Sequence, residues 1–230
     1  MNIFITATDT DVGKTYVSKG IVKELTKRGK KTGYFKPLQS GIVPNILSDA
    51  DNVLSGLKNV PADANAASQT ANFADNLTVK NSYITKTPCT PSVSAEIDGI
   101  EISINKILED YKELEKTCDT VVVEGSGGLF VPSGKDFMMS DIIKILNLSA
   151  IIIARPDLGT INHTLLTIQA LRHLEIKILG VIISNYPKNT TDPAIITAPD
   201  LIEKFGAVKV LDIIQQDGED FSKIVDILIS

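Results

Sequence analysis

Short runs of apolar, mostly β-branched residues recur along this chain, separated by segments long enough to form helices. Each run is apolar at nearly every position rather than at every second one, which is typical of strands buried on both faces. Such strands belong to parallel sheets covered by helices on both sides. The pattern predicts an α/β fold with a mostly parallel β-sheet and three layers. Its strands are expected at residues 3–7, 32–35, 120–123, 150–153, 179–184 and 208–213.

Helical spacing is clearest between the first two expected strands. Val17, Ile21 and Leu25 recur at intervals that place them on one face of a helix, and Gly29 follows as a stop. A second helical pattern runs over residues 104–114 and leads directly into the strand at 120–123. The chain therefore opens with a β-α-β unit, and strand and helix continue to alternate toward its end.

One segment breaks the alternation. Residues 41–99 are polar, rich in Ala and Asn, and interrupted by several prolines. Long irregular segments in parallel α/β domains usually cover the carboxyl edge of the sheet. We therefore predict one domain over residues 1–230 with an irregular cover segment at about 41–99, the alternative being a disordered surface insert. The length of 230 residues suits a single core of this kind.

Charge and composition exclude several classes of protein. The formal net charge is −5, which argues against a basic nucleic-acid binder. Cys89 and Cys118 form no metal-binding pair, and no apolar run reaches the roughly 18 residues that cross a bilayer. The first residues also lack the basic region of a signal peptide. We expect a cytoplasmic protein without nucleic-acid or membrane partners.

The first strand leads into Thr8-Asp9-Thr10-Asp11-Val12-Gly13-Lys14-Thr15, followed by the first helix. This order of strand, loop and helix is that of a P-loop, although Thr8 stands where the motif has its first glycine. Backbone amides at such a helix start bind phosphate. Lys14 is expected to reach the β- and γ-phosphates of a nucleotide, and Thr15 to hold Mg²⁺. The alternative is an ordinary capped helix start.

Three further features fall at the carboxyl ends of expected strands. Glu124 closes the strand at 120–123 and offers a carboxylate on the metal side, followed by glycines that let backbone approach a ligand. Lys36 closes the second strand and adds a second cation. Gly159 precedes another helix start, which is a second potential anion site, whereas His163 beside it is expected to be structural.

The combined motifs resemble the dethiobiotin synthetase family over essentially the whole chain. The segments that carry the resemblance are residues 8–15, Lys36-Pro37 with Ser40-Gly41, residues 123–128 with Val131-Pro132, and residues 158–163. The resemblance implies a P-loop fold, a homodimer, and an ATP- and Mg²⁺-dependent ligase. That ligase closes a cyclic urea on 7,8-diaminononanoate with CO₂ or bicarbonate and releases ADP and phosphate.

The resemblance also implies roles for individual residues. The catalytic groups are Thr10, Lys14 and Lys36, and the metal-side groups are Thr15, Asp49 and Glu124, with Asp51 as the alternative to Asp49. The nucleotide would be bound by Asp11, Val12, Gly13, Lys14, Thr15, Tyr16, Glu124, Gly127 and Asn185. The substrate would be bound by Thr10, Lys36 and Ser40, and across the dimer interface by Gly159, Thr160 and Asn162.

A second function class shares this type of fold, namely a non-enzymatic ATP switch of the partitioning or septum-placement type. Those switches usually carry an additional lysine near the start of the loop, where this chain has Asp9. Their membrane-targeting members end in a basic amphipathic helix, whereas Glu219, Asp220 and Asp226 accompany the last apolar residues here. Phosphate release that depends on diamine and bicarbonate distinguishes the enzyme from the switch.

Overall fold

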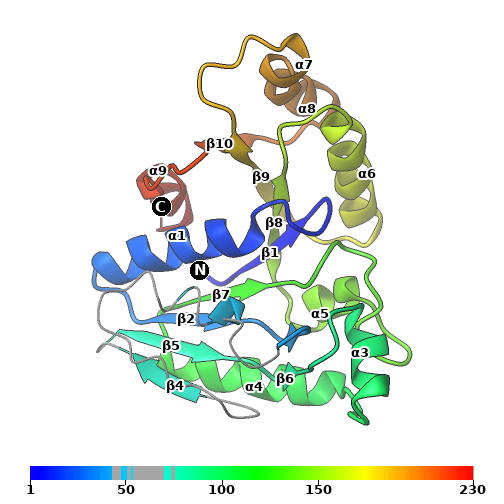
Figure 1. Ribbon diagram of the computed structural model, residues 1–230. Coiled ribbons are helices and arrows are strands. Elements are labelled where there is room, and N and C mark those ends of the chain that lie inside the picture. Colours follow the sequence, from blue (N-terminus) through cyan, green and yellow to red (C-terminus); the bar gives the residue numbers. More distant parts are fainter. Residues whose placement is uncertain (43–47, 51–52, 54–69, 74–75, 230) are drawn as a thin grey trace.

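The computed structural model describes residues 1–42, 48–50, 53, 70–73 and 76–229. Within these residues one sheet of eight strands crosses the molecule in the order β10-β9-β8-β1-β7-β2-β5-β4 (Figure 1). All neighbours pair in parallel except β4, which runs antiparallel to β5 at one edge. The strands are β1 (Ile3–Ala7), β2 (Thr32–Phe35), β4 (Thr70–Phe73), β5 (Leu77–Lys80), β7 (Thr120–Glu124), β8 (Ser149–Ala154), β9 (Ile178–Tyr186) and β10 (Val210–Gln215).

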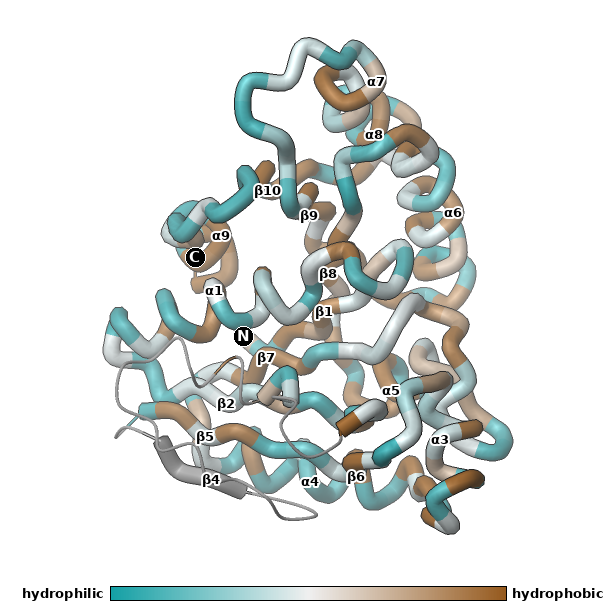
Figure 2. The backbone as a smooth tube through the Cα atoms, viewed as in Figure 1, coloured by the Kyte–Doolittle hydropathy of each residue, from teal (hydrophilic) through white to brown (hydrophobic). Residues whose placement is uncertain are grey.

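Helices cover both faces of this sheet, because successive side chains of each buried strand point to opposite sides. Ile3 and Ile5 of β1 pack with α1 (Lys14–Lys27) and α9 (Ser222–Ile229), whereas Phe4 packs with the helices of the other face. Those helices are α4 (Ile104–Thr117), α5 (Met139–Ile145), α6 (Thr160–His173) and α8 (Ala198–Gly206). The predicted three-layer α/β fold is confirmed, and Figure 2 shows the apolar residues gathered along strands such as β7 and β8.

The strands predicted from apolar runs all form, with ends shifted by no more than two residues. Of the segment at 41–99, predicted as an irregular cover, the structure describes residues 41–42, 48–50, 53, 70–73 and 76–99, and these include short regular elements. Besides β4 and β5 the segment holds β6 (Tyr83–Ile84), which pairs with β3 (Leu38–Gln39) just before the segment, and then α3 (Pro91–Ile97). These strands have four residues or fewer, and β5 ends in a buried Lys80 that is ion-paired with Asp110. They therefore lack the apolar runs from which the other strands were predicted.

The parallel arrangement brings functional loops to one edge of the sheet. Strands β1, β2, β7, β8 and β9 all end there, and the register opposes Ile5 to Glu124 and Phe35 to Val123. In α/β sheets ligands bind outside these carboxyl ends. The short helix α7 (Pro193–Ile196) follows β9. In the part of the chain that the structure describes, no helix combines the length and apolar character that a membrane span requires.

Candidate active site

The loop between β1 and α1 has the backbone shape of a phosphate cradle. Asp11 and Gly13 both adopt positive φ angles, of 58° and 101°. A Cβ atom on Gly13 would lie 2.4 Å from the hydroxyl oxygen of Ser184, so both its angle and its surroundings favour glycine. Among the described residues no side chain caps the start of α1. The first amides of α1 are therefore available to an anion.

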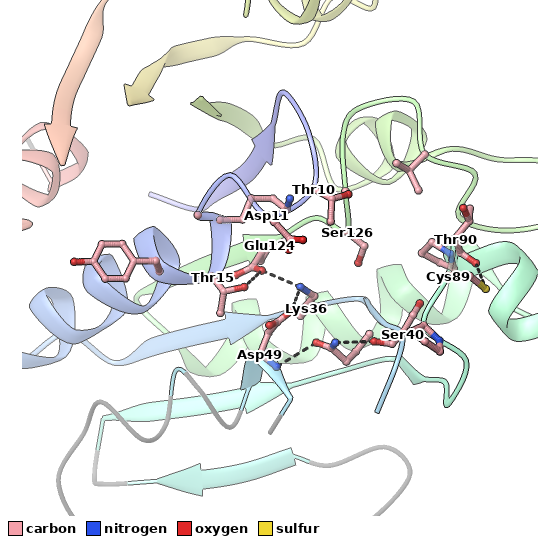
Figure 3. A pocket seen from close by; sticks show the side chains of 18 residues that line it. Thr10, Asp11, Thr15, Lys36, Ser40, Asp49, Cys89, Thr90, Glu124 and Ser126 are labelled. Atoms are coloured by element: carbon pink, nitrogen blue, oxygen red, sulfur yellow. Dashed lines mark hydrogen bonds and ion pairs between the residues drawn. The ribbon is translucent and has the colours of Figure 1, made fainter. Parts of the chain in front are cut away.

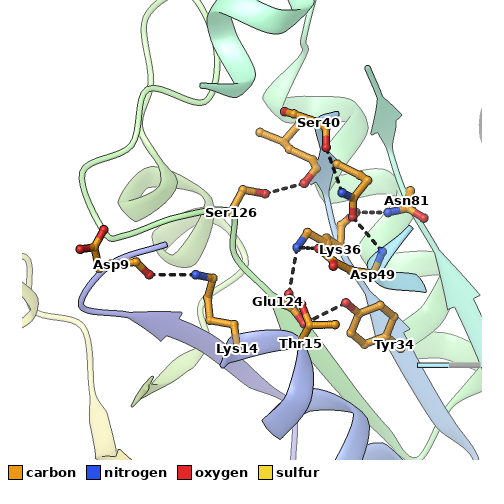
Figure 4. Close-up of polar contacts among 12 residues, drawn as sticks. Asp9, Lys14, Thr15, Tyr34, Lys36, Ser40, Asp49, Asn81, Glu124 and Ser126 are labelled. Atoms are coloured by element: carbon orange, nitrogen blue, oxygen red, sulfur yellow. Dashed lines mark hydrogen bonds and ion pairs between the residues drawn. The ribbon is translucent and has the colours of Figure 1, made fainter. Parts of the chain in front are cut away.

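Lys14 begins α1 and lies beneath this loop. Its Nζ donates a hydrogen bond to the carbonyl oxygen of Asp9 at 3.0 Å, so the side chain curls back along the loop (Figure 4). Burial, and then the ammonium of Lys36, lowers the pKa of Lys14 from 10.5 to about 8. A bound phosphate would stabilise the charged form of this side chain and reverse that shift.

Glu124 ends β7 and is the centre of a buried polar cluster. Its Oε1 accepts hydrogen bonds from the Thr15 hydroxyl at 2.7 Å and from Lys36 Nζ at 2.9 Å. Its Oε2 accepts one from the Tyr34 hydroxyl at 2.9 Å. Burial, and then the Glu124 carboxylate, raises the pKa of Tyr34 well above its ordinary value, so its phenol stays a donor.

Lys36 follows β2 and bridges two carboxylates, because it pairs with Asp49 as well as with Glu124. Burial alone would lower the pKa of Lys36, but the two carboxylates outweigh it and raise the pKa above its ordinary value. Asn81 donates to the carbonyl oxygen of Lys36 at 2.9 Å and so holds its backbone. This lysine is charged at neutral pH.

The donor atoms of this cluster suit Mg²⁺. Thr15, Asp49 and Glu124 offer a hydroxyl and two carboxylates, the hard oxygen ligands that Mg²⁺ prefers. The described residues contain no group of three His, Cys, Asp or Glu side chains that could hold a metal by themselves. Water, and the nucleotide phosphate when one is bound, would complete the coordination, as is usual for Mg²⁺ at phosphoryl-transfer sites. Asp51, the alternative to Asp49, lies outside the described residues.

A cavity of about 870 Å³ opens beside this cluster (Figure 3). The first residue of α3 and its preceding turn, Cys89, Thr90 and Pro91, form the wall opposite the phosphate loop. The predicted site residues that line the cavity are Thr10, Asp11, Gly13, Lys14, Thr15, Tyr16, Lys36, Ser40, Asp49, Glu124 and Gly127. Most of the predicted site residues therefore converge on one cavity.

A second cavity of about 450 Å³ is lined in part by residues of the same loop. Val12 and Asn185 line it, together with Arg155 and the turn formed by Gln215, Gln216 and Asp217. It shares Thr10, Asp11, Gly13 and Tyr16 with the first cavity. Asn185 lies near the end of β9 with a positive φ of 57°. The phosphate loop therefore contributes residues to both cavities.

The structure keeps three predicted residues apart from both cavities. Gly159, Thr160 and Asn162 form the start of α6, where Gly159 has a φ of 97°. Gly159 and Asn162 are exposed, while Thr160 is buried with no hydrogen-bond partner for its hydroxyl among the described residues. None of the three lines a cavity described above.

Sequence reasoning missed several residues of the site. Tyr34 of β2 lies two positions before Lys36, which directly follows the strand, and the alternation of extended backbone places such residues on one face. Arg155 directly follows the buried β8, as Lys36 follows β2. Both signals were present in the sequence. Gln39, whose side chain accepts from the Asp49 amide at 3.3 Å, and Ser126, which donates to the Leu38 carbonyl, carried no such signal.

The parallel sheet, the loop and Lys14 define a P-loop NTPase. The profile of a family described as AAA domain matches residues 1–219. Among solved structures, the fold resembles the MinC:MinD cell division complex of Aquifex aeolicus, with 19% identity, a TM-score of 0.60 and coverage of 98% of this chain and 84% of the other. A plasmid partition protein of Borrelia burgdorferi gives 15% identity, a TM-score of 0.63 and coverage of 99% and 97%. Similarities at this level of identity concern the fold alone.

Curated relatives are closer in sequence. An ATP-dependent dethiobiotin synthetase of Methanocaldococcus jannaschii is 36% identical over 97% of this chain and 99% of its own length. The corresponding proteins of Methanococcus vannielii and Bacillus licheniformis are 38% and 35% identical, over 95% and 91% of this chain and 95% and 83% of their own lengths. The chain therefore belongs to the dethiobiotin synthetase family.

The lowered pKa of Lys14 predicts a measurable proton uptake. Above pH 8 the unbound protein has a mostly neutral Lys14, and phosphate binding restores its proton. Binding of MgATP should take up almost no proton at about pH 6.5 and close to one at about pH 9. Calorimetric titration in two buffers with different ionisation enthalpies measures this number. Lys14→Arg, whose side chain keeps its charge at both pH values, should show no such change in proton uptake. Equal uptake by the wild type at both pH values would contradict the role of Lys14 as a phosphate-binding lysine with a lowered pKa.

Proposed function

We propose that this chain catalyses the ATP-dependent formation of dethiobiotin from 7,8-diaminononanoate and CO₂, with release of ADP and phosphate. The observation that carries the proposal is the meeting of Lys14, Lys36 and Glu124 in one cavity beside the phosphate loop. The membership in the dethiobiotin synthetase family supports the same activity. Both lines point to a phosphoryl-transfer reaction with a small acceptor.

We infer that ATP lies along the loop with its base in the second cavity. The amides at the start of α1 and Lys14 would hold the phosphates, and Asn185 would contact the base. Thr15, Asp49 and Glu124 would hold Mg²⁺, which when bound neutralises phosphate charge. The remaining nucleotide contacts would come from Asp11, Val12, Gly13, Tyr16 and Gly127.

The diamine would bind in the first cavity near Thr10, Lys36 and Ser40. One amine captures CO₂ as a carbamate, and a carbamate oxygen attacks the γ-phosphorus of ATP, which releases ADP. The second amine then attacks the carbonyl carbon of the mixed anhydride, the ring closes and phosphate leaves. Lys14 and Lys36 act by neutralising developing negative charge and by aligning the reactants, and no nucleophilic side chain is required.

We propose that the substrate's carboxylate is bound by a second copy of this chain. The start of α6 offers amides suited to a carboxylate, yet Gly159 and Asn162 line neither cavity of their own subunit. Leu158 and Leu166, on either side of this turn, are 85% and 61% exposed. Exposed apolar side chains of this kind are typical of an interface, which supports a homodimer with the substrate site between subunits.

The switch function receives less support. The relatives named as synthetases are 34–38% identical, whereas the cell-division and partition proteins share the fold at 14–20%. The position of the additional lysine in switches is occupied by Asp9, whose carboxylate lies 4.0 Å from Arg155. The enzyme is therefore the function we retain.

Phosphate release is the direct test of this activity. With the wild-type protein it should require ATP, diamine and bicarbonate together. Lys36→Met should lower kcat by about 10²–10³, because one preorganised charge on the reacting groups is lost. Lys106→Met removes an ammonium from the surface of α4 and should leave the rate within a few-fold. Phosphate release that ignores the diamine would overturn the proposal.

Mixed dimers test the composite site. One subunit carries Lys14→Ala and the other Asn162→Trp, an exposed position where a large side chain blocks the turn without backbone strain. If the substrate's carboxylate binds across the interface, one of the two sites combines an intact phosphate loop with an intact start of α6. Roughly half of the wild-type activity then remains. Self-contained sites would each carry one lesion, so activity near zero would contradict the shared site.

A further inference from the structure

The Glu124 carboxylate is enclosed on all sides in this structure. The residue is 0% exposed, and both carboxylate oxygens have partners. Tyr34, itself fully buried, binds Oε2 from the side of the sheet. Oε1 faces the cavity, and it already accepts from Thr15 at 2.7 Å and from Lys36 at 2.9 Å. Oε1 is therefore the oxygen through which Glu124 could meet a metal, and Lys36 covers it.

Lys36 covers the second carboxylate as well. Its ammonium also pairs with Asp49, so a single charge lies between the two acidic groups (Figure 4). The side chain of Lys36 is 6% exposed, and its backbone is fixed through the bond from Asn81. The ammonium thus occupies the position between Asp49 and Glu124 at which a divalent cation would find its carboxylate ligands.

Two cations cannot share that position. Two like charges a few ångströms apart repel each other strongly in the low effective dielectric of a protein site, and a divalent ion doubles the repulsion. The same oxygen of Glu124 would also have to serve both. Direct coordination by this carboxylate therefore requires the ammonium to leave it.

We propose that Lys36 and the divalent cation occupy the Asp49–Glu124 pair in turn, and that arrival of the metal releases Lys36 toward the reacting carbamate. This inference rests on the metal-side assignment made under the proposed function and extends it. In the metal-free protein Lys36 neutralises the two carboxylates. Once the metal takes over that task, the ammonium is free to turn into the cavity. The metal and its nucleotide then bind before Lys36 engages the carbamate.

Mn²⁺ binding to the nucleotide-free protein, followed by electron paramagnetic resonance, tests the competition. Lys36→Met removes the competing cation and should bind Mn²⁺ at least about tenfold more tightly than wild type, in keeping with close charge pairs. Lys14→Met is the matched control. It removes one positive charge from the same cavity, but the Nζ of Lys14 bonds to the carbonyl of Asp9 rather than to either carboxylate. Its affinity should rise no more than about twofold.

A Lys36→Met protein that binds Mn²⁺ no more tightly than Lys14→Met would overturn the inference, because Lys36 would then hold the carboxylates in place without competing. Lys36→Gln is the second variant, since an amide keeps hydrogen bonding to Asp49 and Glu124 without the charge and protects folding. The same tightening is expected for Lys36→Gln, and an unchanged affinity in this variant would overturn the inference as well.

Thermal unfolding supplies an independent measurement. Mg²⁺ should raise the melting temperature of either Lys36 variant more than that of wild type, because the variants hold uncompensated carboxylates. An equal or smaller rise would count against the exchange. No diamine or ATP enters these assays. If the protein did not form dethiobiotin, the results of the metal-binding and melting assays would still stand. If Lys36 and the metal did not compete, the enzymatic activity would still be decided by the phosphate-release assay.

Discussion

A negative charge buried at the end of a central strand is the constraint on which the site depends. Glu124 is removed from water, and an unpaired carboxylate in such a place is strongly destabilising. Three partners satisfy it: Tyr34 from β2, Thr15 from α1 and Lys36 from the turn after β2. The polar cluster therefore couples the phosphate loop to the strand that carries the second lysine, and a change in any partner alters the others.

The parallel sheet makes this meeting possible. β7 lies between β1 and β2, so the loop before α1 and the turn after β2 flank the carboxylate. The β1–β7 and β2–β7 registers bring residues that are 88 to 109 positions apart in sequence within hydrogen-bond distance. The helices that cover both faces bury the strands and keep these ends fixed. The pKa values of the two lysines differ for the same reason. Lys36 pairs with two carboxylates, which raise its pKa, whereas Lys14 has no carboxylate partner among the described residues and burial lowers its pKa.

Local patterns in the sequence predicted the layers of the fold, and they also named most of the residues that line the candidate cavity. Near-continuous apolar runs predicted the strands of the central sheet, and polar residues at their ends, Lys36 and Glu124, predicted the site because parallel strands end at one edge. Strands β4 and β5 could not be predicted in this way, since they are short and β5 carries a lysine stabilised by distant Asp110. Strand alternation places Tyr34 on the same face as Lys36, but its partner Glu124 belongs to β7, and the sequence does not show that β2 and β7 are neighbours.

The central claim is that the cavity joins the γ-phosphoryl group of ATP to a carbamate held beside Lys36. Transfer of ¹⁸O from labelled bicarbonate to the released phosphate measures this most directly. The oxygen that attacks phosphorus comes from the carbamate, so each phosphate released during ring closure should carry one labelled oxygen. Mass spectrometry of the released phosphate should show this single label in step with ring closure. Phosphate without label, formed at the same rate as dethiobiotin, would contradict it.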